Sequence, residues 1–282
     1  GHGREAMEHE GWPNGAPLVE SPASTAREHL HDINALCVRL ESSVEPIAVV
    51  VGSALSITWG PPKLGVPDVA GMVERLRTHA RGMGWAEEFD AALAKVSPAD
   101  RYQAAFSFLD GRCASVMIDQ LVRDAVLEAR LTDAPSEFEE DGDPAHWHIP
   151  KGTAALGRLL VQPGKGFGPV LTTNFDPLIS LAIERAGGTA ERRVMLRDGS
   201  IAGAADSLVG VRVVHLHGYW RQSETRHLPQ HLTTTRPLLL GLLRNLLRGH
   251  TVLIVAYGGW PDVFMQALEQ VLSEPDSIHD VL

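Results

Sequence analysis

A short run of apolar, mostly β-branched residues constrains the fold more than any other feature of this sequence. The run covers residues 47–51, reads Ile-Ala-Val-Val-Val, and is followed directly by Gly52. A strand with one face in water would alternate apolar and polar residues, so this uninterrupted run is typical of a strand buried on both faces. Such strands occur in parallel sheets that helices cover on both sides. The sequence therefore predicts a parallel sheet at the centre of an α/β protein.

Similar apolar runs recur along the chain. They cover residues 169–171, 211–214 and 251–256, with a weaker candidate at 193–196, and polar or glycine-containing loops follow the three stronger runs. Helical patterns follow two of these runs. Alternation of strands and helices predicts a Rossmann-like, doubly wound parallel sheet.

More than a hundred residues between the first two strong strands carry only helical signals. The helical periodicity lies in residues 69–76, 85–96, 99–109 and 116–131, and the acidic stretch 136–143 is typical of an exposed loop. We therefore expect an all-helical insertion at about 69–160, after the first strand. Four aromatic side chains of this segment either form its core or cover a site or a subunit interface: Trp85, Phe89, Phe106 and Phe108.

The two ends of the chain differ from the rest. Residues 1–21 mix glycine, proline, histidine and charge without a period, which indicates a flexible arm or tag remnant ahead of a domain at 22–282. An amphipathic helix begins at Pro22, with Leu30, Ile33, Cys37, Leu40 and Val44 on its apolar face. Residues 280–282 resemble the opening of a further strand. We therefore expect this chain to be a fragment of a longer polypeptide.

Composition excludes several classes of function. There are 25 Lys and Arg against 35 Asp and Glu, a formal net charge of −10, which disfavours nucleic acid as a ligand of this domain. No apolar run reaches the ~18 residues of a membrane span. The two cysteines, Cys37 and Cys113, cannot form a four-cysteine zinc site, and together with the absence of a signal-peptide pattern they fit a cytoplasmic protein.

The loops after the strong strands carry the candidate site, because ligands of open parallel sheets bind outside the carboxyl ends of the strands. Each of these loops supplies small or polar residues. They are 52–56 (Gly-Ser-Ala-Leu-Ser) with 65–68 (Gly-Val-Pro-Asp), 172–176 (Thr-Thr-Asn-Phe-Asp), 215–218 (His-Leu-His-Gly) and 257–262 (Tyr-Gly-Gly-Trp-Pro-Asp). Their convergence on one edge of the sheet predicts a binding site for a small ligand there.

The first loop suits a phosphate group or forms an ordinary turn. Gly52 allows close backbone approach, and Ser53 and Ser56 offer hydroxyls and amides. The loop lacks the three-glycine dinucleotide fingerprint. The Gly164-Lys165 pair precedes Gly166 rather than Ser or Thr, which disfavours a P-loop nucleotide hydrolase.

Asn174 and Asp176 lie two positions apart where a strand becomes a loop, so both can face one cavity. An amide can hold a water molecule or a sugar hydroxyl, and a carboxylate can orient an amide or a hydroxyl. Asp176 can also cap the helix that Pro177 begins. Capping leaves Asn174 without a task, which favours a functional role for Asn174.

His215 and His217 share one side of a strand end. A pair of imidazoles can ligate a metal, but the sequence offers no matching third and fourth ligand, so we expect no metal. His217 before Gly218 is placed for acid–base work near neutral pH. His215 fits a buried histidine bonded to the backbone.

These motifs, in this order, resemble the sirtuin family. Residues 52–56 resemble its glycine-rich phosphate loop, 65–68 its Gly-Ile-Pro-Asp signature, 173–176 its Gln-Asn-Ile-Asp block, and 217–218 its catalytic His-Gly. The resemblance spans about residues 49–262. It implies a Rossmann-like domain that binds NAD and cleaves the bond between nicotinamide and ribose.

The resemblance also implies roles for individual residues. The implied catalytic residues are Asn174, His217 and Asp176. Asn174 would position water or the ribose, and His217 would bond a ribose hydroxyl and share its proton. Asp176 would orient the nicotinamide amide or the ribose. The implied NAD-binding residues are Gly52, Ser53, Ser56, Pro67, Asp68, Thr173, Gly258 and Asp262, with Gly258 and Asp262 on the adenosine side.

The chain also departs from sirtuin deacylases. It lacks their zinc module, and its first loop reads Gly-Ser-Ala where they have Gly-Ala-Gly. The helical insertion and residues 257–264 resemble the divergent sirtuin-like domains of bacterial anti-phage defence proteins. That branch implies NAD hydrolysis, a homo-oligomer, and a sensor domain or partner outside this chain. The alternatives are a module that senses NAD or ADP-ribose without cleavage, and NAD-dependent group transfer by a deacylase or ADP-ribosyltransferase.

Overall fold

The computed structural model describes residues 22–58, 64–131, 142–196, 198–202, 209–221, 236–257, 263–275, 277–278 and 280–282. The predicted arm at 1–21 lies outside these residues. The chain divides into two compact units, Gly1–Ser43 and Val44–Leu282. The described part of the first unit is helix α1 (Pro22–Ser42), as the sequence predicts. Ile33 and Cys37 of its predicted apolar face are exposed, so this face is not buried within the unit.

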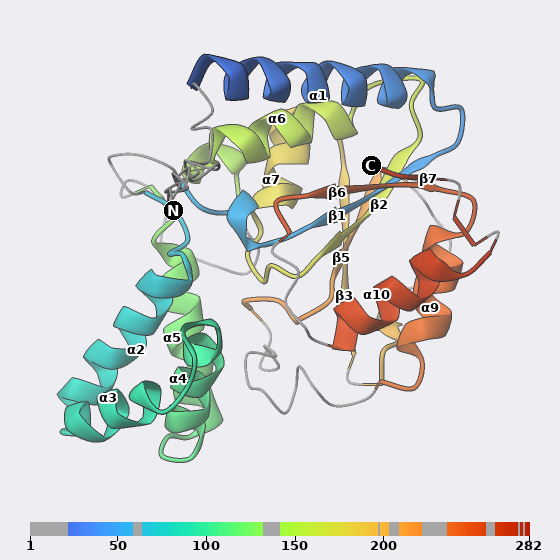
Figure 1. The fold of residues 1–282 in the computed structure, drawn as a ribbon. Helices are drawn as coiled ribbons and strands as arrows, with labels where there is room; N and C mark the ends of the chain where they lie inside the picture. Colours follow the sequence, from blue (N-terminus) through green and yellow to red (C-terminus); the bar gives the residue numbers. More distant parts are fainter. Residues whose placement is uncertain are drawn as a thin grey trace, which may run out of the picture. The chain divides into compact units, whose positions relative to one another are not determined.

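The second unit is built on a seven-stranded sheet (Figure 1). Its strands are β1 (Ile47–Val51), β2 (Phe167–Thr172), β3 (Ala190–Met195), β4 (Ile201–Ala202), β5 (Val211–His215), β6 (Thr251–Val255) and β7 (Asp280–Val281). They follow the order β4-β3-β5-β2-β1-β6-β7, and every neighbouring pair is parallel except β3 and β4. The predicted Rossmann-like parallel sheet is confirmed.

Strand β1 lies at the centre of this sheet. All five of its residues are buried, as their apolar character predicts. Val51, its last residue, is in register with Thr172 of β2 and with Val255 of β6, and Thr172 is in register with His215 of β5. The four strands therefore end together, and the loops that follow them begin side by side.

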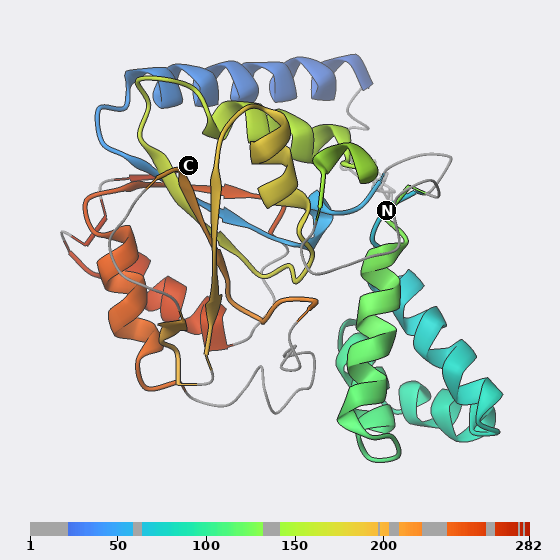
Figure 2. The same cartoon turned by 180° about the vertical axis from the view of Figure 1, so that it is seen from behind.

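Helices cover both faces of the sheet. Helices α6 (Lys151–Leu160) and α7 (Leu178–Arg185) lie over one face, and α9 (Leu239–Leu247) and α10 (Val263–Ser273) lie over the other (Figures 1 and 2). The second pair buries its apolar stripes against the sheet in one hydrophobic cluster. Such two-sided coverage explains why β1 needs no polar residue.

From β1 the chain adds β2 to β5 on one side of the sheet and β6 and β7 on the other, so the strand order reverses between β1 and β6. Ligands bind at this point in doubly wound folds. The chain turns there through the 3-10 helix η1 (Ser53–Leu55).

Helices α2 (Val69–Gly82), α3 (Ala86–Ala94), α4 (Arg101–Asp110) and α5 (Ser115–Leu127) form a bundle between β1 and β2 in the chain (Figure 1). The bundle has its own hydrophobic cluster, in which Phe89, Phe106 and Phe108 are buried and against which Trp85 packs. Phe89 and Phe108 meet edge to face, with ring centroids 5.3 Å apart. The alternative that these aromatic residues form the core is confirmed, because amphipathic helices bury their apolar faces against one another.

No helix in the described part of the chain is long and apolar enough to cross a membrane.

Gly52 is required by a close approach between two strand ends. A Cβ at this position would lie 2.7 Å from the Ala256 carbonyl oxygen and from the Tyr257 Cα, both of which are backbone atoms. We expect Gly52→Ala to lower the free energy of unfolding by about 1–3 kcal/mol, since packed backbone cannot yield cheaply. Chemical denaturation measures this change.

Gly241→Ala is the matched control for Gly52→Ala. Gly241 lies in α9, and a Cβ there would meet nothing within 4 Å. Alanine is the better helix former by about 0.5–1 kcal/mol, so this variant should be more stable than the parent. Equal stability of the two variants would show that the approach at Gly52 is not restrictive.

Candidate functional site

A cleft opens where the loops after β1, β2, β5 and β6 begin. It encloses about 940 Å³ of space, including space open to solvent. The lining residues are Ser53, Ser56, Ile57, Val66, Pro67, Asp68, Val69, Met72, Tyr102, Gln103, Thr173, Asn174, Phe175, Asp176, His217 and Tyr257. The cleft therefore collects most of the predicted site residues.

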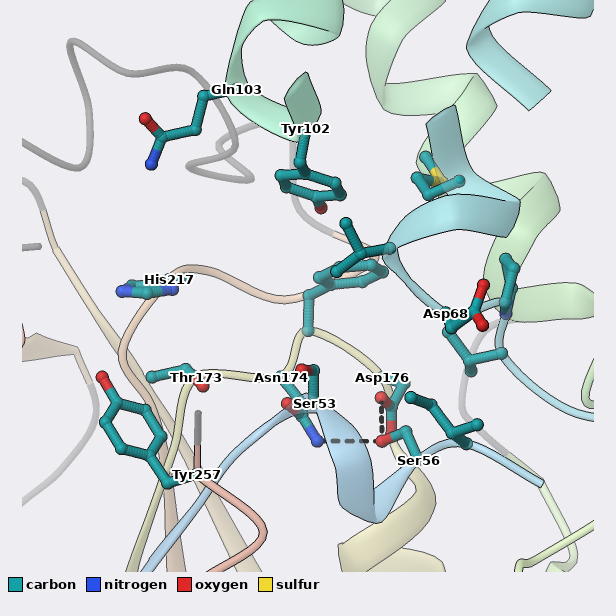
Figure 3. A pocket seen from close by; sticks show the side chains of 16 residues that line it. Ser53, Ser56, Asp68, Tyr102, Gln103, Thr173, Asn174, Asp176, His217 and Tyr257 are labelled. Atoms are coloured by element: carbon teal, nitrogen blue, oxygen red, sulfur yellow. Dashed lines mark hydrogen bonds between the residues drawn. The ribbon is translucent and has the colours of Figure 1, made fainter. Parts of the chain in front are cut away.

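A chain of hydrogen bonds joins the loops after β1 and β2 (Figure 3). The Asn174 side-chain amide Nδ2 donates to the Gly52 carbonyl at 3.0 Å and to Ser56 Oγ at 2.8 Å. Ser56 Oγ in turn donates to Asp176 Oδ2 at 2.6 Å. Asp176 Oδ1 accepts from the Leu178 backbone N–H at 3.0 Å. We call this set of bonds the loop network.

The loop network determines which way Asn174 points. Its amide has two N–H donors, and both are used, one by Gly52 and one by Ser56. The amide cannot turn over without losing both bonds, so Oδ1 is the atom left to accept a hydrogen bond from a ligand. The side chain is 8% exposed and lines the cleft. Asn174 therefore offers a preorganised acceptor.

Asp176 is held inside the protein. It is 3% exposed, and each of its carboxylate oxygens accepts a hydrogen bond from the protein. Asp176 was predicted to cap a helix that Pro177 begins, but α7 begins at Leu178 and its N-cap residue is Pro177; Asp176, one residue earlier, accepts from the Leu178 N–H. Asp176 still borders the cleft, so its carboxyl group lies at the edge of that space.

His215 fixes the backbone of Asn174. It is fully buried, and its Nδ1 lies 2.7 Å from the Asn174 carbonyl oxygen. A carbonyl only accepts, so Nδ1 carries the proton and donates. The Asn174 backbone N–H donates to Thr172 Oγ1 at 3.0 Å. The interpretation of His215 as a buried histidine bonded to the backbone is confirmed.

His217 faces the cleft from the loop after β5. It is half-buried and lies in the view of Figure 3 on the side of Thr173 and Tyr257, opposite Asp68 and Asp176. Gly218 has a φ of 94°, which turns the chain immediately after the histidine at no cost to a side chain. An imidazole in this place can exchange a proton with a bound ligand.

The remaining predicted residues have different positions. Ser53, Pro67 and Thr173 line the cleft. Asp68 lines it too, and its Oδ1 also caps α2 by accepting from the Gly71 N–H at 2.7 Å. Gly258 and Asp262 lie outside the described residues.

The bundle supplies cleft residues that the sequence did not predict. Val69 and Met72 of α2 line the cleft, as do Tyr102 and Gln103 of α4. Figure 3 shows the side chains of Tyr102 and Gln103. Burial raises the pKa of the Tyr102 phenol above its ordinary value, so this group is neutral at pH 7. Nothing in the local sequence marks these residues, because their role depends on how the bundle meets the sheet.

Thr153 of α6 is a further residue that the sequence did not predict. It is 1% exposed, and its hydroxyl donates to the Leu55 carbonyl in η1. This bond anchors the loop after β1 from a helix about a hundred residues further along the chain.

Within the described ranges, no three or more His, Cys, Asp or Glu side chains are grouped so that they could hold a metal ion.

Ser56 is the centre of the loop network, and its removal should be costly. Ser56→Ala would remove the hydrogen bonds that Ser56 Oγ makes to Asp176 Oδ2 and to one Asn174 N–H, and Ser56 is only 5% exposed. Unsatisfied buried polar groups cost about 1–3 kcal/mol, so we expect a loss of stability of that size. Ser53→Ala, on the same loop but at an exposed position, should change stability by less than about 0.5 kcal/mol. Denaturant unfolding of both variants checks this, and equal losses would contradict it.

The fold defines an α/β protein of the Rossmann-like class, with a cleft at the switch point of its sheet that both apolar and polar side chains line. Residues 169–280 match the family model described as SIR2-like domain. This match begins in β2 and includes Asn174, Asp176 and His217. It supports a sirtuin-like domain and an activity related to NAD. A search of curated proteins gives no match.

Proposed function

We propose that this protein hydrolyses NAD to nicotinamide and ADP-ribose. The observation that carries the proposal is the preorganised Asn174 amide, which shares one cleft with His217 in the part of the chain that matches a SIR2-like domain. The cleft has aromatic and apolar groups for a flat ring and polar groups for a sugar. Both are needed at the nicotinamide–ribose bond.

The reaction we propose is a displacement by water at C1′ of the ribose. The bond to nicotinamide breaks with its electron pair on the ring nitrogen, and the ribose gains oxocarbenium character before water adds. Asn174 Oδ1 accepts a hydrogen bond from this water or from a ribose hydroxyl. An amide cannot take up the proton that water must lose, so another group is required.

His217 is the group we assign to that proton. A neutral imidazole accepts a proton near pH 7, either from the water directly or through a ribose hydroxyl. Asp176 contributes its charge, because a carboxylate held by Ser56 and Leu178 needs no rearrangement when positive charge develops on the sugar. The histidine thus moves the proton, and the aspartate stabilises the transition state.

The other site residues are assigned to binding. Ser53 and Thr173 offer hydroxyls to the cleft, and Pro67 and Asp68 line it next to the start of α2. We assign the pyrophosphate to the loop at 52–56. Gly258 and Asp262 remain our candidates for the adenosine side.

Incubation of the purified protein with NAD, followed by chromatography of the products, tests this function. Equal amounts of nicotinamide and ADP-ribose support hydrolysis. Nicotinamide together with a modified macromolecule would show group transfer. Binding of NAD without release of nicotinamide would show a sensing module. A His217→Ala sample prepared in parallel controls for a contaminating hydrolase.

The setting we propose is anti-phage defence in the cytoplasm, where NAD depletion would stop an infected cell. We also propose that activity depends on a homo-oligomer and on a sensor domain or partner outside this chain. Specific activity and molar mass measured together over a wide concentration range, with and without the full native polypeptide, test this dependence. Full activity of a dilute monomer, unchanged by added partner, would rule it out.

A further inference from the structure

The peptide that precedes His217 is held from two sides. The Leu216 backbone N–H donates to the Thr172 carbonyl at 2.9 Å, which continues the β2–β5 pairing. The Leu216 carbonyl accepts from Arg236 Nη1 at 2.9 Å. Leu216 itself is fully buried. Both backbone groups of the residue before His217 are therefore fixed by hydrogen bonds.

Arg236 makes this contact from inside the protein. The residue is only 4% exposed, and the same Nη1 lies 3.2 Å from Met195 Sδ. A buried guanidinium is costly unless its N–H groups are hydrogen-bonded, so the bond to Leu216 offsets part of that cost. Arg236 does not line the cleft, and its effect on a ligand must pass through other residues.

The backbone around Arg236 is held as well. Its carbonyl accepts from the Leu239 N–H at 3.1 Å at the start of α9, and the nearby Leu238 N–H donates to Asp198 at 2.9 Å. The guanidinium therefore extends from a fixed point to the Leu216 carbonyl. A hydrogen bond between two fixed points resists movement of the peptide that it joins.

We propose that Arg236 is a positioning residue that keeps His217 directed into the cleft by holding the Leu216 carbonyl. The chain turns at Gly218 just after the histidine, and a glycine imposes little restraint of its own. The direction of the His217 side chain then depends on the peptide before it. The kinetic part of this inference rests on the proposed hydrolysis, whereas the placement of the imidazole does not.

The first test is kinetic and uses Arg236→Met, which keeps a long side chain but loses the donors. A displacement of about 1 Å at a catalytic group can cost about 10²-fold in rate, so we expect kcat to fall by about that factor and KM to stay within about twofold. Arg236→Lys retains a positive charge and hydrogen-bond donors, so its kcat should lie between those of the parent and of Arg236→Met. An unchanged kcat in Arg236→Met, in a parent that cleaves NAD, would overturn the inference and leave the proposed function intact.

The matched control is Arg244→Met in α9. Arg244 pairs with Glu274, its Nη2 lying 2.5 Å from Glu274 Oε1, and its side chain is 40% exposed. This variant loses the same guanidinium without touching the loop of His217. It should keep the kcat of the parent. An equal fall of kcat in both variants would make the effect a general consequence of losing an arginine, and would overturn the inference.

The second test follows the imidazole itself by proton–carbon NMR of the His217 ring, assigned with His217→Ala. We expect Arg236→Met to shift this signal and to leave in place that of His250, a half-buried histidine whose Nδ1 lies 3.0 Å from the Arg248 carbonyl oxygen. If the parent does not cleave NAD but the signal shifts, the proposed function fails and the positioning role stands. If the His217 signal does not move in Arg236→Met, the positioning role is overturned. It is also overturned if both Arg236→Met and Arg236→Lys lose their folded structure, because Arg236 would then be only a core residue.

Discussion

The His217→Ala variant is expected to lose NAD cleavage by a factor of about 10²–10⁴, the usual contribution of a general acid or base. The imidazole is the group in the cleft that we assign to the proton of the attacking water. Its removal should leave the fold intact, because the side chain is half-buried and lines a cleft. Release of nicotinamide under saturating NAD measures the effect, and thermal unfolding measures the fold.

His215→Ala is the control for this prediction. His215 is fully buried and donates to the Asn174 carbonyl, so its loss removes packing and a hydrogen bond together. We expect this variant to lose more stability than His217→Ala does. A parent-like rate of nicotinamide release in His217→Ala would remove the role that we assign to His217.

The fold could be predicted from the sequence because its main signals are local. The burial of β1 on both faces follows from its own five residues, and the helical periodicity of α2 to α5 follows from theirs. Each of these five elements carries enough apolar pattern to be recognised without knowledge of its neighbours. The order of the strands in the sheet could not be predicted in this way, because it depends on contacts between segments that are distant in the chain.

The candidate site could be predicted in part for a related reason. Asn174, Asp176 and His217 follow strands directly, and the rule that ligands bind at carboxyl ends of parallel strands was enough to select them. The hydrogen bonds that hold these side chains could not be predicted. Ser56 lies 120 positions from Asp176 and still donates to it, and only the folded structure brings the two together.

The same limit explains the residues that were missed. Tyr102 faces the cleft from α4, while its neighbour Phe106, 5.0 Å away between ring centroids, belongs to the core of the bundle. Both are aromatic residues in one amphipathic pattern. Which of them faces a ligand depends on how the bundle meets the sheet, and no local periodicity encodes that.

Asn174→Ala is expected to stop turnover while NAD still binds. An acceptor that orients water or the ribose matters more in the transition state than in the ground state, so its loss should lower kcat by about 10²-fold or more with a small change in affinity. Titration calorimetry measures NAD binding by the variant. Equal losses of affinity and of rate would instead make Asn174 a residue that binds substrate and transition state alike.

The loop network provides the control that separates this catalytic role from a structural one. Asn174→Ala and Ser56→Ala both break the hydrogen bond between Asn174 Nδ2 and Ser56 Oγ, and both variants should lose stability. Only Asn174→Ala also removes Oδ1, whereas in Ser56→Ala the amide keeps its bond to Gly52 and its acceptor in place. The fall in kcat should therefore be larger for Asn174→Ala at a similar loss of stability. If the two variants lose the same kcat, the amide acts by holding the loops together, and the water or ribose must be oriented by another group.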